Sequence, residues 1–188
     1  MQDWVEWHEA YGDPASGLSA RLRCVQRHLA WAIDQAAAGP VRLVSLCAGQ
    51  GHDVAAVLPA HARRDDVSAV LVEADPGNAA LARSRAAAAG LAQVEVRESD
   101  ASQPAAFADA LPADVLLLCG IFGNVSDADI ERVAAAAPGL CAPGATVIWT
   151  RHRRPPDLTA RIRAWFTDAG FADQAFETLD TTPRQQSE

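Results

Sequence analysis

The sequence predicts an α/β fold with a doubly wound, mostly parallel sheet and helices on both of its faces. Short apolar segments typical of strands alternate with segments of helical periodicity from Val41 onward. The segment 113–119 is continuously apolar, which is typical of a strand that is covered on both faces. Alternation at this spacing favours crossover connections, and therefore parallel strands.

The predicted elements follow one another in a regular order. Residues 18–38 have apolar side chains at helical spacing and end at Gly39-Pro40, so they predict a helix that precedes the sheet. Asp75 is expected to cap the helix that starts at Pro76 and ends before Gly90. In chain order, the remaining predicted elements are a strand over 41–46, a helix over 53–62, strands over 67–72, 94–96 and 113–119, a helix over 126–137, a strand over 145–150, a helix from Asp157 to Gly170 and a sixth strand over 171–179.

Length and charge exclude several functional classes. The chain has 188 residues, which is typical of one domain, and 49% of them are hydrophobic, which is enough for a full core. Its formal net charge of -8 argues against a dedicated nucleic-acid-binding protein, although it allows a local basic patch. No apolar run is long enough to span a membrane, and the acidic N-terminus is unlike a signal peptide.

The four cysteines are widely spaced and form no CxxC pair, so they are expected to be reduced thiols in a cytoplasmic protein. None of the histidines has the HxxxH or HxH spacing of a metal site, and no metal is expected. We divide the chain into a helical cap or lid (1–40), a core (41–180) and a flexible tail (181–188). Aromatic and imidazole side chains of the leader either cover a pocket or pack onto the first helix; they belong to Trp4, Trp7, His8 and Tyr11.

A glycine-containing turn and a following acidic residue carry the strongest functional signal. Gly49 and Gly51 follow the first predicted strand, where they permit a tight turn and a close approach of the backbone to a ligand. Glu73 ends the second strand, and a carboxylate at this position can accept both hydrogen bonds of a ribose diol. Together these features predict a nucleoside-containing ligand at the carboxyl ends of the strands.

Two observations argue against a dinucleotide ligand. The dinucleotide fingerprint requires a small residue three positions after its second glycine, and this chain has the branched Val54 there. In addition, a chain without lysine has no Tyr-x-x-x-Lys pair, which weakens the alternative of a nicotinamide-dependent oxidoreductase.

From about Val41 to Phe176 the chain resembles the class I S-adenosylmethionine-dependent methyltransferases, which have a Rossmann-like fold. The similarity is in four segments: 44–53 with the glycine turn, 70–76 with Glu73, 98–101, and 115–124. The segments 119–124 and 149–154 are most similar to an actinobacterial subgroup that implies no particular acceptor.

The resemblance implies a set of donor-binding residues, with S-adenosyl-L-methionine as cofactor and S-adenosyl-L-homocysteine as product. In the family, an Asp side chain at the position of Asp100 and the following backbone N–H hold the adenine edge, and the fourth segment passes beside the donor methyl group. The implied donor site consists of Cys47, Ala48, Gly49, Gly51, His52, Glu73, Ala74, Asp100, Ala101, Cys119 and Gly120.

The chain departs from the family in two places. Ser45 and Cys47 stand where the family has an acid and a glycine, so backbone carbonyls and water are expected to hold the methionine amino group. The family also ends with an antiparallel strand, for which little sequence remains after the sixth predicted strand. We therefore expect this strand to be missing or diverged, and an uncovered edge would favour a homodimer.

The acceptor side has one candidate base and one basic segment. His152 follows the fifth strand and is the best candidate for a general base, with an exposed loop histidine as the alternative. Between Arg151 and Arg163 five arginines face one aspartate, so this patch either binds an anionic acceptor or is only a solvated surface. The predicted acceptor-side residues are Tyr11, Phe122, Asn124, Arg151 and Arg153.

These observations predict a methyltransferase that methylates O or N of a small molecule by in-line displacement. The first alternative is an RNA methyltransferase that uses the patch from Arg151 to Arg163. The second is a non-catalytic module that binds S-adenosylmethionine or a partner protein. Nucleic acid remains the less favoured partner, and no membrane partner is expected.

Overall fold

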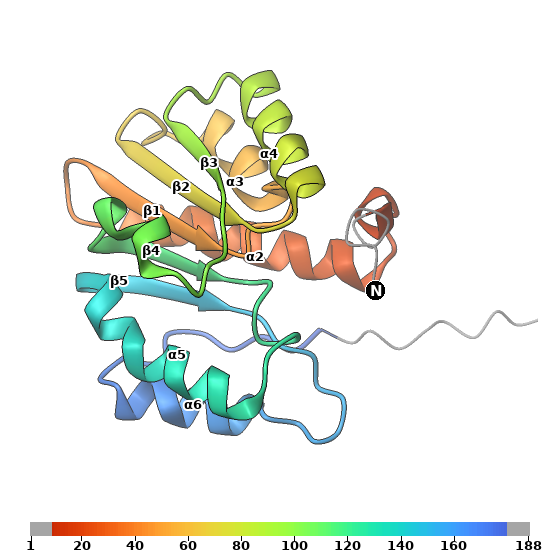
Figure 1. Ribbon diagram of the computed structural model, residues 1–188, viewed down its shortest axis with the longest axis vertical. Helices are drawn as coiled ribbons and strands as arrows, with labels where there is room; N and C mark the ends of the chain where they lie inside the picture. The colour runs from red at the N-terminus through yellow and green to blue at the C-terminus, as the bar shows by residue number, and fades with distance from the viewer. Residues whose placement is uncertain (1–8, 180–188) are drawn as a thin grey trace, which may run out of the picture.

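The computed structural model describes residues 9–179 and contains one sheet of five parallel strands in the order β3-β2-β1-β4-β5 (Figure 1). This arrangement confirms the predicted α/β, doubly wound fold. The strands are β1 (Val41–Leu46), β2 (Val67–Glu73), β3 (Val94–Glu98), β4 (Ala113–Leu118) and β5 (Cys141–Trp149). The helices are α2 (Gly17–Gln35), α3 (His52–Val57), α4 (Pro76–Ala88), α5 (Asp127–Leu140) and α6 (Thr159–Asp168), with short 3₁₀ turns η1 (Glu9–Gly12), η2 (Leu58–Ala60), η3 (Pro104–Ala106) and η4 (Ala108–Ala110).

Strand order reverses beside β1. From β1 the chain proceeds to β2 and β3 on one side, and then returns to place β4 and β5 on the other side. All four pairings are parallel, so the carboxyl ends of the strands lie along one edge of the sheet. In a sheet of this kind, ligands bind outside the carboxyl ends at the point of reversal. The fold therefore directs attention to the loops that follow β1, β2 and β4.

Each face of the sheet has its own hydrophobic core, because alternate strand residues point to opposite faces. On one face, Leu29 and Ile33 of α2 are fully buried against strand residues such as Leu43, together with side chains of α3 and α4. On the other face, Ile130 of α5 and Ile162 of α6 are equally buried. Since α2 covers the sheet along with α3 and α4, it belongs to one of the two helical layers (Figure 1).

The predicted helix starts are confirmed at two of three positions. The side chain of Asp75 accepts a hydrogen bond from the Asn78 N–H and caps α4. Ser126 caps α5 in a reciprocal capping box with Asp129. At α6 the N-cap position is Leu158, and Asp157 lies one residue earlier, where it accepts from the N–H of Thr159.

Several predicted boundaries shift by a few residues. The helix expected over 53–62 is a six-residue α3 followed by η2, because Pro59 interrupts the regular hydrogen bonding. The strand expected over 145–150 begins earlier, at Cys141, directly after α5. No helix within residues 9–179 combines the length and hydrophobicity that a membrane span requires.

The sixth strand predicted over 171–179 is wrong: the structure has no strand in this segment. Instead, Phe171 packs edge-on against Phe166 of α6, and Glu177 binds residues of α2 on the opposite face. The segment therefore passes around the outer edge of β5. Side-chain contacts to α6 and α2 stand in place of the backbone hydrogen bonds that a sixth strand would form with β5. The loose alternation of apolar and polar residues in this segment reflects these contacts and not a strand.

Two groups of predicted residues lie outside the part of the chain that the structure describes. They are the leader side chains of Trp4, Trp7 and His8, and the tail over 181–188. Among residues 9–179 the sheet contains no antiparallel strand. Whether the family's last strand is missing or diverged stays a prediction.

Candidate functional site

The turn after β1 has the backbone conformation that a close ligand approach requires. Gly49 and Gly51 have φ values of 57° and 64°, in the left-handed region where glycine carries no steric penalty. Cys47 has a φ of 53° and is the only non-glycine residue with positive φ among the described residues. The backbone at this position is therefore the conformation that glycine adopts most easily, although this chain has a cysteine there.

Glu73 lies beside this turn at the end of β2. Its Oε2 accepts a hydrogen bond of 2.7 Å from the Gly49 N–H, and its Oε1 accepts one of 2.9 Å from the Asp75 N–H. The side chain is buried, and these two bonds fix its orientation. Each carboxylate oxygen has a second lone pair, so the group can still accept two hydrogen bonds from a ligand diol.

Asp100 brings a second carboxylate to the same edge of the sheet. The Ser99 N–H binds the Glu73 carbonyl oxygen at 3.0 Å, which holds the loop after β3 against the end of β2. The backbone N–H of Ser102 donates to Asp100 and lowers the pKa of this exposed carboxyl, so it is ionised near neutral pH. Desolvation and the carboxylates of Glu73 and Asp100 raise the pKa of Cys47 to about 11, which keeps its thiol neutral.

The loop after β4 closes the other side of the turn. A Cβ atom on Gly120 would lie 2.7 Å from the carbonyl oxygen of Cys47, so the two loops touch through their backbones. Thr150 donates to the Cys119 carbonyl at 2.6 Å and thus ties the end of β5 to the same loop. Asn124 donates its side-chain amide to the Gly120 carbonyl at 2.8 Å, and it therefore stabilises the turn.

The predicted donor-site residues are brought together at the carboxyl ends of four strands. They lie at or just after the ends of four strands: Cys47, Ala48, Gly49, Gly51 and His52 at β1, Glu73 and Ala74 at β2, Asp100 and Ala101 at β3, and Cys119 and Gly120 at β4. The β1 and β4 groups flank the point where strand order reverses.

A polar cluster above the turn joins the predicted residues Tyr11 and His52 to residues that were not predicted from the sequence. The ring centroid of Tyr11 lies 4.9 Å from that of His52, and Arg21 donates to the Tyr11 hydroxyl at 2.7 Å. Arg85 donates to both the carbonyl and the side chain of Gln50 within the turn. Asp53 is buried nearby, and desolvation raises the pKa of its carboxyl. The one sequence signal for Asp53 is its position as an acidic residue in the first turn of the helix that follows the glycine turn.

On the acceptor side, the loop after β5 meets the loop after β4. Arg151 donates to the carbonyl oxygen of Phe122, and its Nε is buried without a hydrogen-bond partner in the described residues. His152 lies close to Gly123, and desolvation together with Arg151 and Arg154 holds the pKa of this histidine below its usual value. The imidazole is thus neutral near pH 7, as a general base must be.

Two of the predicted features on this side are altered by the packing. Phe122 has 0% exposure, and its ring packs against those of Trp149 and Phe166, so its side chain is not available to an acceptor. Arg153 forms an ion pair with Asp157, and Arg163 forms one with Asp173. The basic patch is therefore partly neutralised.

A cavity of about 1020 Å³ lies on the β5 side of the molecule. Its walls come from α2, β5, α6, the loop from Thr150 to Arg154 and the segment 171–179. Arg21 and His152 line it, but Glu73 and the glycine turn do not. The cavity therefore adjoins the predicted acceptor-side residues and is separate from the predicted donor-site residues at the strand ends.

No protein-family model and no curated protein sequence matches the chain. Solved structures do match. An O-methyltransferase family protein from Burkholderia thailandensis is 21% identical, with a TM-score of 0.63 over 82% of this chain and 51% of that one. An RNA methyltransferase from Salinibacter ruber, solved in complex with S-adenosyl-L-homocysteine, is 26% identical, with a TM-score of 0.51 over 68% of this chain and 73% of that one.

A third similar structure is precorrin 8w decarboxylase from Methanobacterium thermoautotrophicum, which is 18% identical, with a TM-score of 0.55 over 79% of this chain and 72% of that one. The chain spans about half the length of the O-methyltransferase family protein. The chain has the fold of the S-adenosylmethionine-dependent methyltransferases, as its sequence resemblance predicts. None of these comparisons tests the resemblance to the actinobacterial subgroup.

Proposed function

We propose that this chain binds S-adenosylmethionine at the carboxyl ends of β1, β2 and β4 and transfers its methyl group to a small molecule. The observation that carries this proposal is the Glu73 carboxylate, which is fixed by the N–H groups of Gly49 and Asp75 beside the glycine turn. A buried acid with free lone pairs at this position suits the two hydroxyls of a ribose.

The other donor-site residues have roles consistent with this arrangement. The ionised carboxylate of Asp100 and the backbone N–H of Ala101 would hold the adenine edge. The turn from Cys47 to Gly51 would hold the methionine part. The cofactor supplies a methyl group on a positively charged sulfur, which is already activated for displacement. The protein therefore has to orient the acceptor and exclude water.

His152 is the proposed general base for an acceptor that carries a proton. Its neutral imidazole lies on the acceptor side, near the loop that contains Gly123. Arg151 and Arg153 would orient an acidic group on the acceptor, while Tyr11 and Asn124 would shape the site. Phe122 is left out of this proposal because its ring is buried.

A small molecule is the favoured acceptor because of the charge distribution. The net charge of -8 opposes binding of a polyanion, and two arginines of the basic patch are already paired with aspartates. The O-methyltransferase family protein supports O-methylation. The four unpaired cysteines support a reducing, cytoplasmic location. A homodimer stays a prediction.

RNA is the second candidate acceptor. The similarity to an RNA methyltransferase and the exposed Arg154 beside the acceptor side favour it. If RNA binds there, the affinity should fall steeply as the salt concentration rises, because bound arginines displace counterions from phosphates. Binding of RNA that does not depend on salt, or no binding, would eliminate this candidate.

The direct test of the proposal is calorimetric titration with S-adenosylmethionine and with S-adenosylhomocysteine, followed by an assay of S-adenosylhomocysteine formation with a panel of hydroxyl- and amine-bearing small molecules. Donor binding with product formation would support the methyltransferase. Donor binding without product, across both small molecules and RNA, would favour the non-catalytic module. No binding at millimolar donor would contradict the proposal altogether.

A further inference from the structure

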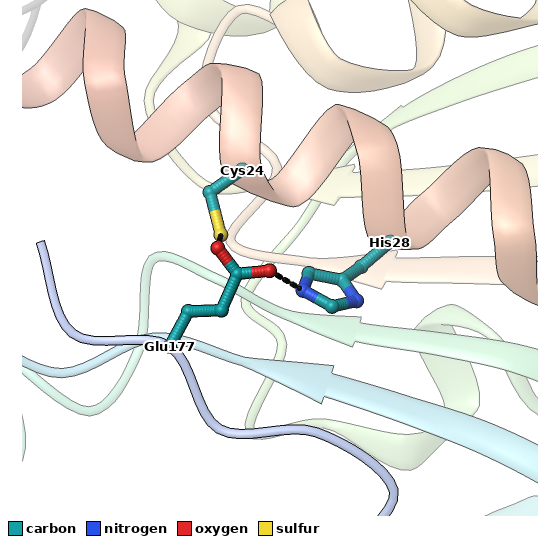
Figure 2. A group of neighbouring side chains, drawn as sticks. All are labelled: Cys24, His28 and Glu177. Carbon is teal, nitrogen blue, oxygen red and sulfur yellow. Dashed lines mark hydrogen bonds and ion pairs between the residues drawn. The ribbon is translucent and has the colours of Figure 1, made fainter.

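A second polar cluster joins α2 to the segment 171–179, apart from the donor site. Cys24 and His28 are one helical turn apart on α2, and both point toward Glu177 (Figure 2). The Cys24 Sγ lies 3.4 Å from Glu177 Oε2, and the His28 Nε2 lies 2.8 Å from Glu177 Oε1. The three potential ligand atoms lie within 4.8 Å of one another.

We propose that Cys24, His28 and Glu177 bind a zinc-like divalent metal ion through Cys24 Sγ, His28 Nε2 and a Glu177 carboxylate oxygen. Thiolate, imidazole and carboxylate are the three ligand types of protein zinc sites. All three residues also line the cavity on the β5 side, which leaves space for a water molecule as fourth ligand. The site is independent of the proposed methyl transfer, which requires no metal.

Charge balance favours an ion of charge +2 at this position. In the structure the Cys24 thiol donates its hydrogen to Glu177. When the metal binds, Cys24 loses this proton to solvent and forms a metal–sulfur bond. One thiolate and one carboxylate then neutralise the two positive charges, and His28 contributes a neutral nitrogen.

Arg27 would compete with the metal for Glu177. Among the described residues it is the only positively charged side chain, other than the proposed ligand His28, that forms an ion pair with this carboxylate. Its guanidinium lies 2.8 Å from Glu177 Oε2, and its side chain is 61% exposed. Because it lies on the solvent side, the guanidinium can turn away when an ion occupies the carboxylate. If the cluster is a metal site, removing the Arg27 guanidinium should therefore strengthen metal binding. If the cluster is only a set of ion pairs, no metal binds with or without Arg27.

The site explains how the segment 171–179 could be fixed where a strand is missing. Glu177 is 153 residues from Cys24 in the chain, and the metal would link α2 to the segment 171–179 beside β5. The sequence pattern C-x-x-x-H in α2 was visible, but the third ligand is supplied only by the fold. The expectation of no metal was based on the absence of CxxC, HxxxH and HxH spacings, so a cluster that combines one cysteine, one histidine and a distant glutamate escaped it.

The test is Zn²⁺ binding to the full chain after treatment with a chelator, measured by competition with a chromophoric indicator. We expect one Zn²⁺ per chain, and at least about tenfold weaker binding in each of Cys24→Ser, His28→Gln and Glu177→Gln. Cys141→Ser is the matched control, because this cysteine lies at the start of β5, and it should bind as the wild type does. Circular dichroism checks that each variant is folded.

Two further readouts use chains that keep all three ligands. Co²⁺ added to the wild type should produce the near-ultraviolet charge-transfer band of a thiolate ligand. Arg27→Gln should bind Zn²⁺ more tightly than the wild type, because a competing cation is removed. Absence of Zn²⁺ binding, a Co²⁺ spectrum without a thiolate band, or binding that Cys24→Ser leaves unchanged would each overturn the proposal.

Discussion

Gly120 and Cys47 bring the loops after β4 and β1 into direct contact. The distance of 2.7 Å between a Cβ on Gly120 and the Cys47 carbonyl oxygen leaves no room for a side chain. Both partners are backbone atoms near the donor site, so neither can move without shifting a strand end. This contact explains why a residue without a side chain stands in the loop after β4.

Substitution Gly120→Ala should therefore reduce the free energy of unfolding by about 1–3 kcal/mol, because the added methyl group forces the two loops apart. Urea denaturation measures this change. Gly123→Ala is the matched control, since its nearest neighbour would be the His152 Cδ2 at 3.9 Å, and it should change stability by less than about 0.5 kcal/mol. Equal losses in the two variants would contradict the contact.

The position of His152 leads to a prediction about pH. Desolvation and two neighbouring arginines hold the pKa of His152 below its usual value, so the imidazole is neutral near pH 7. If it acts as the base, the rate of methyl transfer to a hydroxyl acceptor should be constant above this pKa and fall below it. His152→Gln should remove at least about 99% of the activity and the acidic limb. A pH profile that is unchanged in the variant would exclude this role.

At the level of elements, the outer side of the sheet depends on an aromatic cluster between β5 and α6. Trp149 and Phe166 stack with centroids 6.2 Å apart, and Phe171 closes the cluster from the segment 171–179. This cluster holds α6 on the sheet although no strand of the described chain pairs with the outer edge of β5.

We expect Phe166→Ala to lower the free energy of unfolding by about 3–5 kcal/mol, because it leaves a cavity in the core. Phe176 is 41% exposed, and the guanidinium of Arg163 lies 4.8 Å from its ring centroid. Phe176→Ala should therefore cost less than about 1 kcal/mol. Thermal or urea denaturation measures the free energy of unfolding of the two variants. Similar losses of stability would show that the segment 171–179 contributes more to the core than the exposure of Phe176 indicates.

The strands and most helices of this fold could be predicted from sequence, because they depend on local patterns. The run over 113–119 and the caps at Asp75 and Ser126 identify their elements without tertiary information. The segment 171–179 could not, because its alternation satisfies side-chain contacts to α6 and α2 that only the fold creates.

The positions of some candidate-site residues also follow from local patterns. The glycine turn and Glu73 have a fixed relation to their strands, so the sequence predicts that they lie side by side, as the structure shows, while their role in binding stays a prediction. The roles of Arg21, Asp53 and Arg85 depend on how η1, α2 and α4 converge above the turn, and no local pattern contains this information. Phe122 was misjudged because residues that follow a strand can point either to the ligand or into the core.

At the level of the whole molecule, the net charge of -8 and the order of the strands set the limits of the function. An acidic surface suits a cationic cofactor and disfavours a polyanionic acceptor. Strand reversal beside β1 provides one place where four loops meet, and the central claim is that S-adenosylmethionine binds there through Glu73.

Calorimetric titration of S-adenosylhomocysteine into the wild type, Glu73→Gln and Glu73→Ala tests this claim most directly. Loss of the carboxylate should weaken binding by about 1–3 kcal/mol in the alanine variant, because its hydrogen bonds to the ribose are charge-assisted, and by less in the glutamine variant, which keeps one acceptor. Glu131→Gln on α5 serves as the control and should bind as the wild type does. If the affinity of Glu73→Ala equals that of the wild type, Glu73 does not hold the ribose, and the proposed site is contradicted.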